Sequence, residues 1–136
     1  MIKLQKVINR LLSETDFGTV EIAQELQPNL QTRALYCGQI SIEQIVVDKG
    51  SFDDFGQLLS ENLLIQIVTS VMELEVDLLQ VYQAIAGWVY ADGTDTKDGS
   101  LSKFALVKGN LMAVNNGRIH WYYEFKITYP ILGACL

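Results

Sequence analysis

The apolar residues of the first twelve positions recur at the spacing of an amphipathic helix. They are Ile2, Leu4, Val7, Ile8, Leu11 and Leu12, and polar residues separate them. Positions three and four apart share one face of a helix. The pattern therefore predicts a first helix that ends around Ser13. The segment from Thr19 to Leu26 fits either a helical turn or a short strand before Pro28.

Two later segments have the composition of strands. Arg33 to Val47 is rich in β-branched and aromatic residues, which predicts a long strand with a bulge near Gly38. Leu63 to Val68 is a short apolar run with polar residues on both sides, which predicts a central strand buried on both faces. The intervening stretch, Asp48 to Gln57, combines glycines and aspartates and is typical of a loop.

A second helix follows the buried run and ends near Tyr90. Its apolar face carries Leu74, Leu78, Val81, Tyr82, Ile85 and Val89, while Glu73, Asp77, Gln80 and Gln83 mark the opposite, solvent-facing side. Acidic residues in the first turn are stabilised by the helix dipole. The next ten residues, Ala91 to Ser100, have the composition of an exposed loop.

Asn116-Gly117 predicts a two-residue β-hairpin, because both positions of a type I′ turn need a positive φ. Pairing Val114 with Ile119 then fixes the rest of the register. It aligns Met112 with Trp121, Asn110 with Tyr123, Lys108 with Phe125, Leu106 with Ile127 and Phe104 with Tyr129. Met112, Trp121, Phe125 and Ile127 should lie under the helices. The other face of the last strand, with His120, Tyr122, Glu124, Lys126 and Thr128, should be exposed.

These elements predict one α+β domain over residues 1–136. A single mixed or antiparallel sheet of about four strands, with two to three helices on one face and a C-terminal β-hairpin, accommodates all of them. The chain contains no internal repeat and no linker long enough to separate domains.

Composition narrows the functional classes. The net charge of −6, with lysines and arginines scattered along the chain, argues against specific nucleic-acid binding. Cys37 and Cys135 lack the spacing of a metal or redox pair, which indicates free thiols in a reducing compartment. Neither a signal peptide nor a membrane-spanning segment is apparent, so we expect a soluble protein with no membrane contact.

Candidate catalytic residues are few, and each has a structural explanation. His120 is the only histidine, and no nucleophile lies at a diagnostic spacing from it. Asp92, Asp95 and Asp98 recur every third residue, which does not match an EF-hand calcium loop. No phosphate-binding glycine motif follows any strand. We therefore predict no catalytic residue, no metal site and no cofactor.

The order of the elements resembles the small tail proteins of bacteriophages, in particular the tail-terminator and Mu-like minor tail protein group. The resemblance spans most of residues 1–130. It rests on the helix, long strand and buried strand, then the helix ending in Ile85-Ala86-Gly87-Trp88, an acidic loop, and the closing strand with Gly117, Trp121, Tyr123 and Phe125.

That resemblance implies a structural subunit of the virion tail, assembled in the bacterial cytoplasm. Such a subunit forms a ring, typically hexameric, that caps the tail tube and contacts the head-completion proteins. A non-enzymatic binding or regulatory module, such as a toxin-neutralising or adaptor protein, is the alternative. The expected contact residues lie on the last strand and in the Asp48–Glu61 segment: His120, Tyr122, Glu124, Lys126, Asp53 and Asp54.

Overall fold

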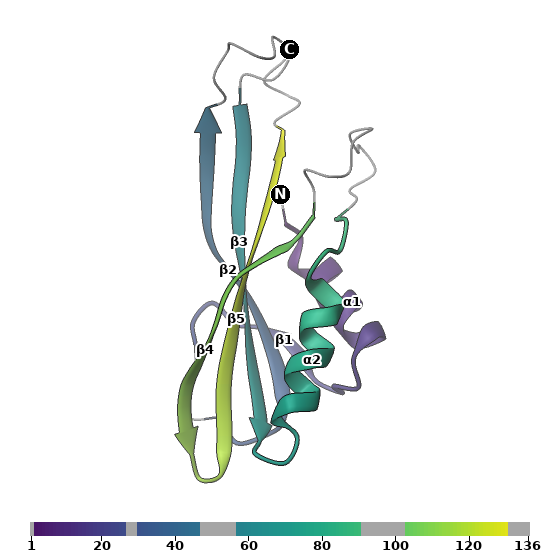
Figure 1. The fold of residues 1–136 in the computed structure, drawn as a ribbon, viewed down its shortest axis with the longest axis vertical. Coiled ribbons are helices and arrows are strands. Elements are labelled where there is room, and N and C mark those ends of the chain that lie inside the picture. Colours follow the sequence, from purple (N-terminus) through teal and green to yellow (C-terminus); the bar gives the residue numbers. More distant parts are fainter. Residues whose placement is uncertain (1, 27–29, 47–56, 91–102, 131–136) are drawn as a thin grey trace.

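The computed structural model describes residues 2–26, 30–46, 57–90 and 103–130. They form two helices and five strands (Figure 1). In chain order these are α1 (Leu4–Glu14), β1 (Val20–Ile22), β2 (Ala34–Val46), β3 (Gln57–Ser70), α2 (Leu74–Ile85), β4 (Ala105–Asn115) and β5 (Arg118–Pro130). The predicted α+β class is confirmed. The sheet has one strand more than the expected four, because the undecided segment after Phe17 contains β1.

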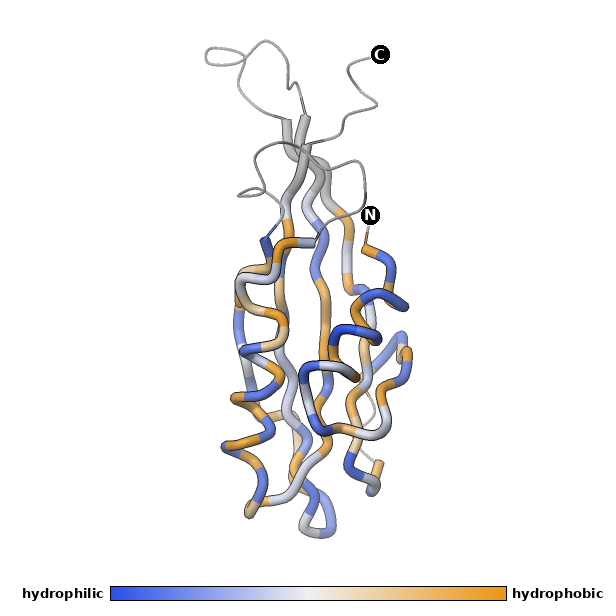
Figure 2. Tube along the Cα trace, turned by 90° about the vertical axis from the view of Figure 1, so that its right-hand side faces the viewer, coloured by the Kyte–Doolittle hydropathy of each residue, from blue (hydrophilic) through white to orange (hydrophobic). Residues whose placement is uncertain are grey.

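The five strands form one mixed sheet in the order β1-β2-β3-β5-β4. Strand β1 runs parallel to β2, whereas all other neighbours are antiparallel. Both helices lie on the same side of the sheet, and Figure 2 shows them next to each other in front of the strands. We call this the helix side, and the opposite face the helix-free side.

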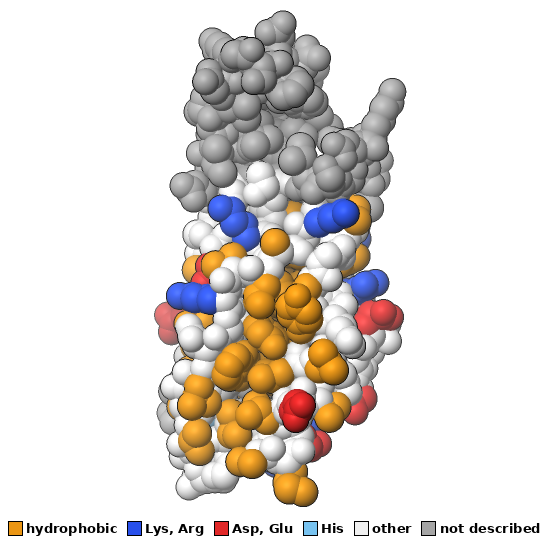
Figure 3. Space-filling model, viewed as in Figure 1, with side chains coloured by type: hydrophobic (Ala, Val, Ile, Leu, Met, Phe, Trp, Pro, Cys, Tyr) orange, Lys and Arg blue, Asp and Glu red, His pale blue; other side chains and the backbone are white. Residues whose placement is uncertain are grey.

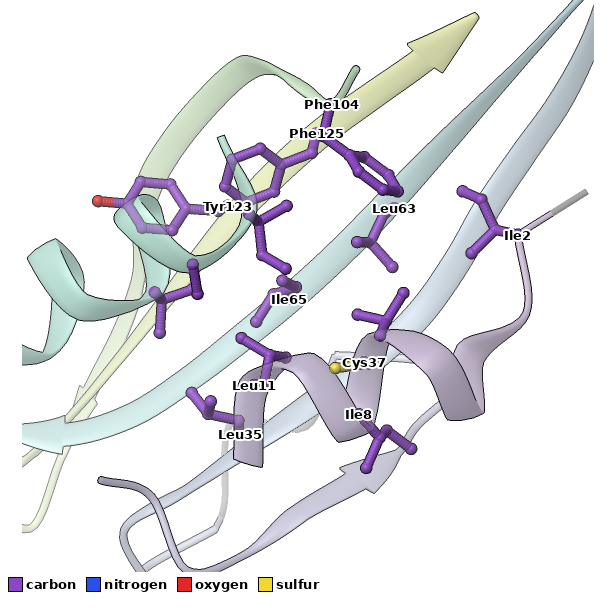
Figure 4. Close-up of a cluster of buried hydrophobic side chains, with 14 of the residues drawn as sticks. Ile2, Ile8, Leu11, Leu35, Cys37, Leu63, Ile65, Phe104, Tyr123 and Phe125 are labelled. Carbon is purple, nitrogen blue, oxygen red and sulfur yellow. The ribbon is translucent and has the colours of Figure 1, made fainter. Parts of the chain in front are cut away.

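The main core lies between the helices and the first half of the sheet. Val7 and Leu11 of α1 and Val81 and Ile85 of α2 are fully buried there. Figure 4 shows Leu11 of α1 directed toward the helix-side residues of β2 and β3, which include Leu35, Cys37, Leu63 and Ile65. Their alternation along each strand follows from the two-residue period of a β-strand, which places every second side chain on one face.

Strand β3 occupies the centre of the sheet, and both of its faces are buried. Leu63, Ile65 and Ile67 are fully buried on the helix side, while Gln66 and Val68 are buried on the helix-free side. The prediction of a central strand buried on both faces is therefore confirmed. The buried amide of Gln66 contacts the ring of His120 on β5, so a polar pair occupies this part of the sheet.

The predicted hairpin forms, but most of its predicted register is wrong. Asn116 and Gly117 have φ values of 52° and 77°, and Val114 pairs with Ile119 as expected. Two irregularities, between Leu106 and Lys108 and between Leu111 and Ala113, each insert an extra residue into β4. A β-bulge shifts every pair beyond it.

The observed pairs are therefore Leu111 with Trp121, Asn110 with Tyr122, Lys108 with Glu124 and Leu106 with Phe125. Of the residues expected under the helices, Phe125 and Ile127 are buried and Trp121 is partly buried against the core. Met112 falls at the second irregularity and is only half-buried.

The first turn of α2 also differs from the prediction, because Asp77 points inward. Its carboxylate is buried and accepts hydrogen bonds from the Arg33 guanidinium at 2.7 and 3.1 Å and from the Thr69 hydroxyl at 2.6 Å. The spacing of polar residues predicted that Asp77 faces solvent. That spacing cannot show that Arg33, 44 positions away, pairs with Asp77 in the fold. The helix ends at Ile85, earlier than predicted.

Candidate interaction surface

The helices protect the two halves of the helix side unequally. Helix α1 contacts β1 and β2, and α2 contacts β3. By contrast, none of the eleven residues of β4 is buried. The sheet is therefore wider than the two helices cover, and its β4 edge presents side chains to solvent.

Several of these exposed side chains are large and apolar. Because paired residues share a face of the sheet, the pairs with Phe125, Trp121 and Ile119 place Leu106, Leu111 and Val114 on the helix side. Leu111 is 56% exposed and Val114 is 63% exposed. The outward surface of α2 adds Leu79, at 52%, and Tyr82, at 41%.

We call these residues, together with Trp121 and Tyr123 of β5, the open apolar face. In Figure 3 it forms a nearly continuous area of hydrophobic side chains over β4, β5 and α2, with a single acidic side chain within it. Its exposed apolar area is on the order of several hundred Å², which is the size of the largest patch on a typical monomeric protein, a patch that is often functional. Such areas mark sites where proteins bind one another.

Gly109 allows the aromatic part of this face to form. A Cβ atom at this position would lie 2.8 Å from the ring of Tyr123 and 3.1 Å from that of Trp121. The two rings meet edge to face with centroids 6.0 Å apart, and the Tyr123 hydroxyl donates to the backbone carbonyl of Leu78 at 3.4 Å. The absence of a side chain at Gly109 thus lets both rings lie against β4.

The helix-free side contains the contact residues expected on the last strand, but His120 is not exposed there. Its side chain is fully buried, and Nδ1 lies 3.2 Å from the Gln66 amide nitrogen. Burial lowers the pKa of His120 below its ordinary value of 6.5, although a nearby backbone group of Leu30 acts in the opposite direction. The prediction of an exposed histidine is wrong because the Gln66 side chain and the backbone of Leu30 lie against the ring.

Tyr122, Glu124 and Lys126 are half-buried on the same side. The Glu124 carboxylate accepts a hydrogen bond from the Asn62 amide at 2.6 Å, and the Tyr122 hydroxyl accepts one from Asn110 at 3.1 Å. These residues share one side of the sheet with His120, as predicted. Asp53 and Asp54, and the aspartates of the Ala91–Ser100 segment, lie outside the described residues.

Glu61 and Cys37 are two further ionisable residues that are buried in the core. Glu61 accepts hydrogen bonds from the backbone N–H of Ile2 at 2.7 Å and from the Gln39 amide. Burial raises the pKa of the Cys37 thiol to about 12, so this thiol is an unreactive core residue at neutral pH. Across the described ranges, no group of three or more histidine, cysteine or acidic side chains could hold a metal ion.

Comparison with known proteins adds no relative: no protein-family model matches the chain, and no curated protein matches it. Neither described helix is long and apolar enough to cross a membrane.

Sequence reasoning identified the aromatic strand but missed the open apolar face. The predicted register placed Met112 under the helices and paired Leu106 with Ile127, whereas the structure leaves Met112 half-buried and Leu106 40% exposed. One signal was present in the sequence: β4 has apolar residues at adjacent as well as alternate positions, such as Leu106-Val107 and Leu111-Met112. An exposed edge strand with apolar residues in both phases indicates an intermolecular contact.

Proposed function

We propose that this protein is a non-enzymatic structural subunit that assembles with copies of itself into a ring at the end of a bacteriophage tail. The observation that carries the proposal is the open apolar face. A standard interface buries roughly 800 Å² on each partner. The exposed apolar side chains of β4 and α2, which include Leu111, Val114 and Leu79, supply part of such an interface.

The open apolar face lies toward one edge of the sheet, so we propose that it contacts a different surface of the next copy. A contact between two different surfaces of identical subunits repeats around an axis and either closes into a ring or continues as a filament. A ring, hexameric in the group that the sequence resembles, would cap the tail tube and bind head-completion proteins. Of the described elements, α1, β2, β3, α2 and β5 follow one another in the order on which that resemblance rests, while β1 is additional to it.

Light scattering coupled to size-exclusion chromatography, over a wide range of concentrations, tests self-assembly. We expect one defined oligomer, visible as rings by negative-stain electron microscopy. Replacing two residues of the open apolar face, Leu79→Glu with Val114→Glu, should give a folded monomer. The matched control is Val71→Glu, which changes a side chain exposed to 73% in the turn before α2.

A wild-type protein that remains monomeric at every concentration would contradict the ring. If that monomer instead co-purifies with one tight partner, a binding or regulatory module is the better description. The tail assignment has its own test, because tail-tube and head-completion genes should neighbour the gene for this protein. Their absence would leave a self-assembling subunit outside a virion.

A further inference from the structure

The two edges of the sheet carry opposite charges. Strand β4 contains Lys108 and no carboxylate, and Lys103 and Arg118 flank it. Residues 14–26, which include β1, contain no cation and four carboxylates: Glu14, Asp16, Glu21 and Glu25. Asp16 is neutralised by Arg33 at 2.7 Å, whereas Glu21 and Lys108 make no ion pair with another described residue. One edge is therefore basic and the other acidic.

Glu21 and Lys108 also lie on the same side of the sheet. Glu21 pairs with Tyr36, Tyr36 with Gln66, and Gln66 with Tyr122, so all four side chains share the helix-free side. Lys108 pairs with Glu124, two residues along from Tyr122, and so belongs to that side as well. The Lys108 ammonium lies over the Tyr122 ring, 5.9 Å from its centroid. Each edge thus carries its charge on the side away from the helices.

The helix side of each edge is apolar. On β1, Ile22 pairs with the core residue Cys37 and is 50% exposed. Leu12 of α1, which contacts β1, is 45% exposed. On β4, Leu111 and Val114 occupy the helix side, as described above. Both edges therefore have the same two layers, apolar on the helix side and charged on the helix-free side, with opposite sign of charge.

We infer that the β4 edge of one copy docks against the β1 edge of the next copy, with Lys108 facing Glu21 and Leu111 and Val114 facing Ile22. This inference rests on the proposed function, since it names the two surfaces through which the copies meet. A symmetric contact of β4 with β4 would join two basic edges, and one of β1 with β1 would join two acidic edges. Like charges in an interface are costly, so the head-to-tail arrangement is favoured.

Charge reversal at either residue tests the contact. Lys108→Glu and Glu21→Lys, each alone, should weaken self-association by about tenfold or more, because each places like charges opposite one another. Mixing the two single variants should restore assembly, since every contact in an alternating ring then joins opposite charges. The double variant should also assemble. Light scattering reports the mass, and sedimentation velocity reports the association constant.

Lys6→Glu is the matched control, because it reverses a lysine charge that belongs to neither edge strand; its ammonium lies 4.6 Å from the centroid of the Tyr90 ring. It should assemble like the wild type. Thermal unfolding shows whether each variant is folded, since exposed substitutions usually change stability by less than about 0.5 kcal/mol. Recovery to dimers alone would overturn the head-to-tail arrangement, because a symmetric contact closes at two copies.

Two results separate this inference from the function on which it depends. If the wild type forms rings and both single reversals form them equally well, the copies meet elsewhere, and only the inferred contact fails. The same holds if the single variants are impaired but their mixture is not restored. If the wild type never assembles, the proposed function itself fails.

Discussion

The two halves of the helix side contain similar apolar residues, but one half is buried under the helices and the other is exposed. Under α1 and α2, Leu35, Leu63 and Ile65 are fully buried. On β4, two strands from β3 and three from β2, Leu111 and Val114 point to the same side of the sheet and are more than half exposed. Apolar strand residues therefore do not by themselves mark a core. What distinguishes the halves is whether the chain supplies a helix to cover them.

The covered half should be far more sensitive to truncation. Leu63→Ala removes a fully buried side chain from the central strand, and such changes typically cost about 2–5 kcal/mol. We expect the free energy of unfolding in urea to fall by about 3 kcal/mol, with an unchanged m-value. A loss below about 1 kcal/mol would show that this half is loosely packed and that the contrast is wrong.

Breaking the ion pair between Arg33, just before β2, and Asp77 of α2 should give the next largest loss of stability. Arg33→Met leaves the buried Asp77 carboxylate with only the hydrogen bond from the Thr69 hydroxyl. Glu73 also loses the cation that it pairs with in the wild type. Removing one partner of a buried pair costs several kcal/mol, and because Arg33 is partly exposed we expect about 2 kcal/mol. Urea unfolding of Arg33→Met, Asp77→Asn and the double variant measures the coupling. Additive effects would contradict the pair.

Asp77 and Arg33 also show which features a sequence pattern cannot predict. Local signals gave α1, α2, the central strand and the Asn116-Gly117 turn, because propensity, periodicity and turn geometry depend on neighbouring residues. The partner of Asp77 lies 44 positions away, so its burial follows from tertiary contacts. The bulges of β4 likewise have no clear mark in the sequence, and two extra residues were enough to change the predicted pairs beyond Val114 and Ile119.

The candidate surface was also only partly predictable from the sequence. The side shared by His120, Tyr122, Glu124 and Lys126 was predictable from strand alternation. Their exposure was not, because it depends on the neighbours of β5 in the sheet. The open apolar face escaped prediction since its residues look like core residues, and only the limited reach of two helices leaves them uncovered.

The buried His120 gives the helix-free side a pH response. Its folded-state pKa is lowered by burial, so as pH falls through about 6.5 the unfolded chain binds a proton that the folded chain does not. This contribution to stability is complete above the unfolded pKa and is lost as pH falls toward the folded pKa. The free energy of unfolding should thus decrease between pH of about 7.5 and about 5.5.

His120→Gln should reduce that decrease, because His120 is the only histidine in the chain. The measurement is urea unfolding of both proteins at the two pH values and one protein concentration. An identical pH response in the variant would show that the ring is solvated, and that the helix-free side is open at this position.

The open half should give the smallest change in folding stability and a clear change in association. Leu111→Ser replaces an apolar side chain that is already 56% exposed, so the monomer loses little burial, and we expect an unfolding free energy within about 0.5 kcal/mol of the wild type. In the oligomer the same residue would be covered by the next copy, and its loss should shift the balance toward monomer. Sedimentation velocity measures that shift, with Ile67→Val as the opposite case. Trimming this fully buried residue should lower stability by about 1 kcal/mol without weakening the contact between copies. If Leu111→Ser destabilises the monomer as much as Ile67→Val does, then β4 belongs to the core, and the distinction between the covered and open halves disappears.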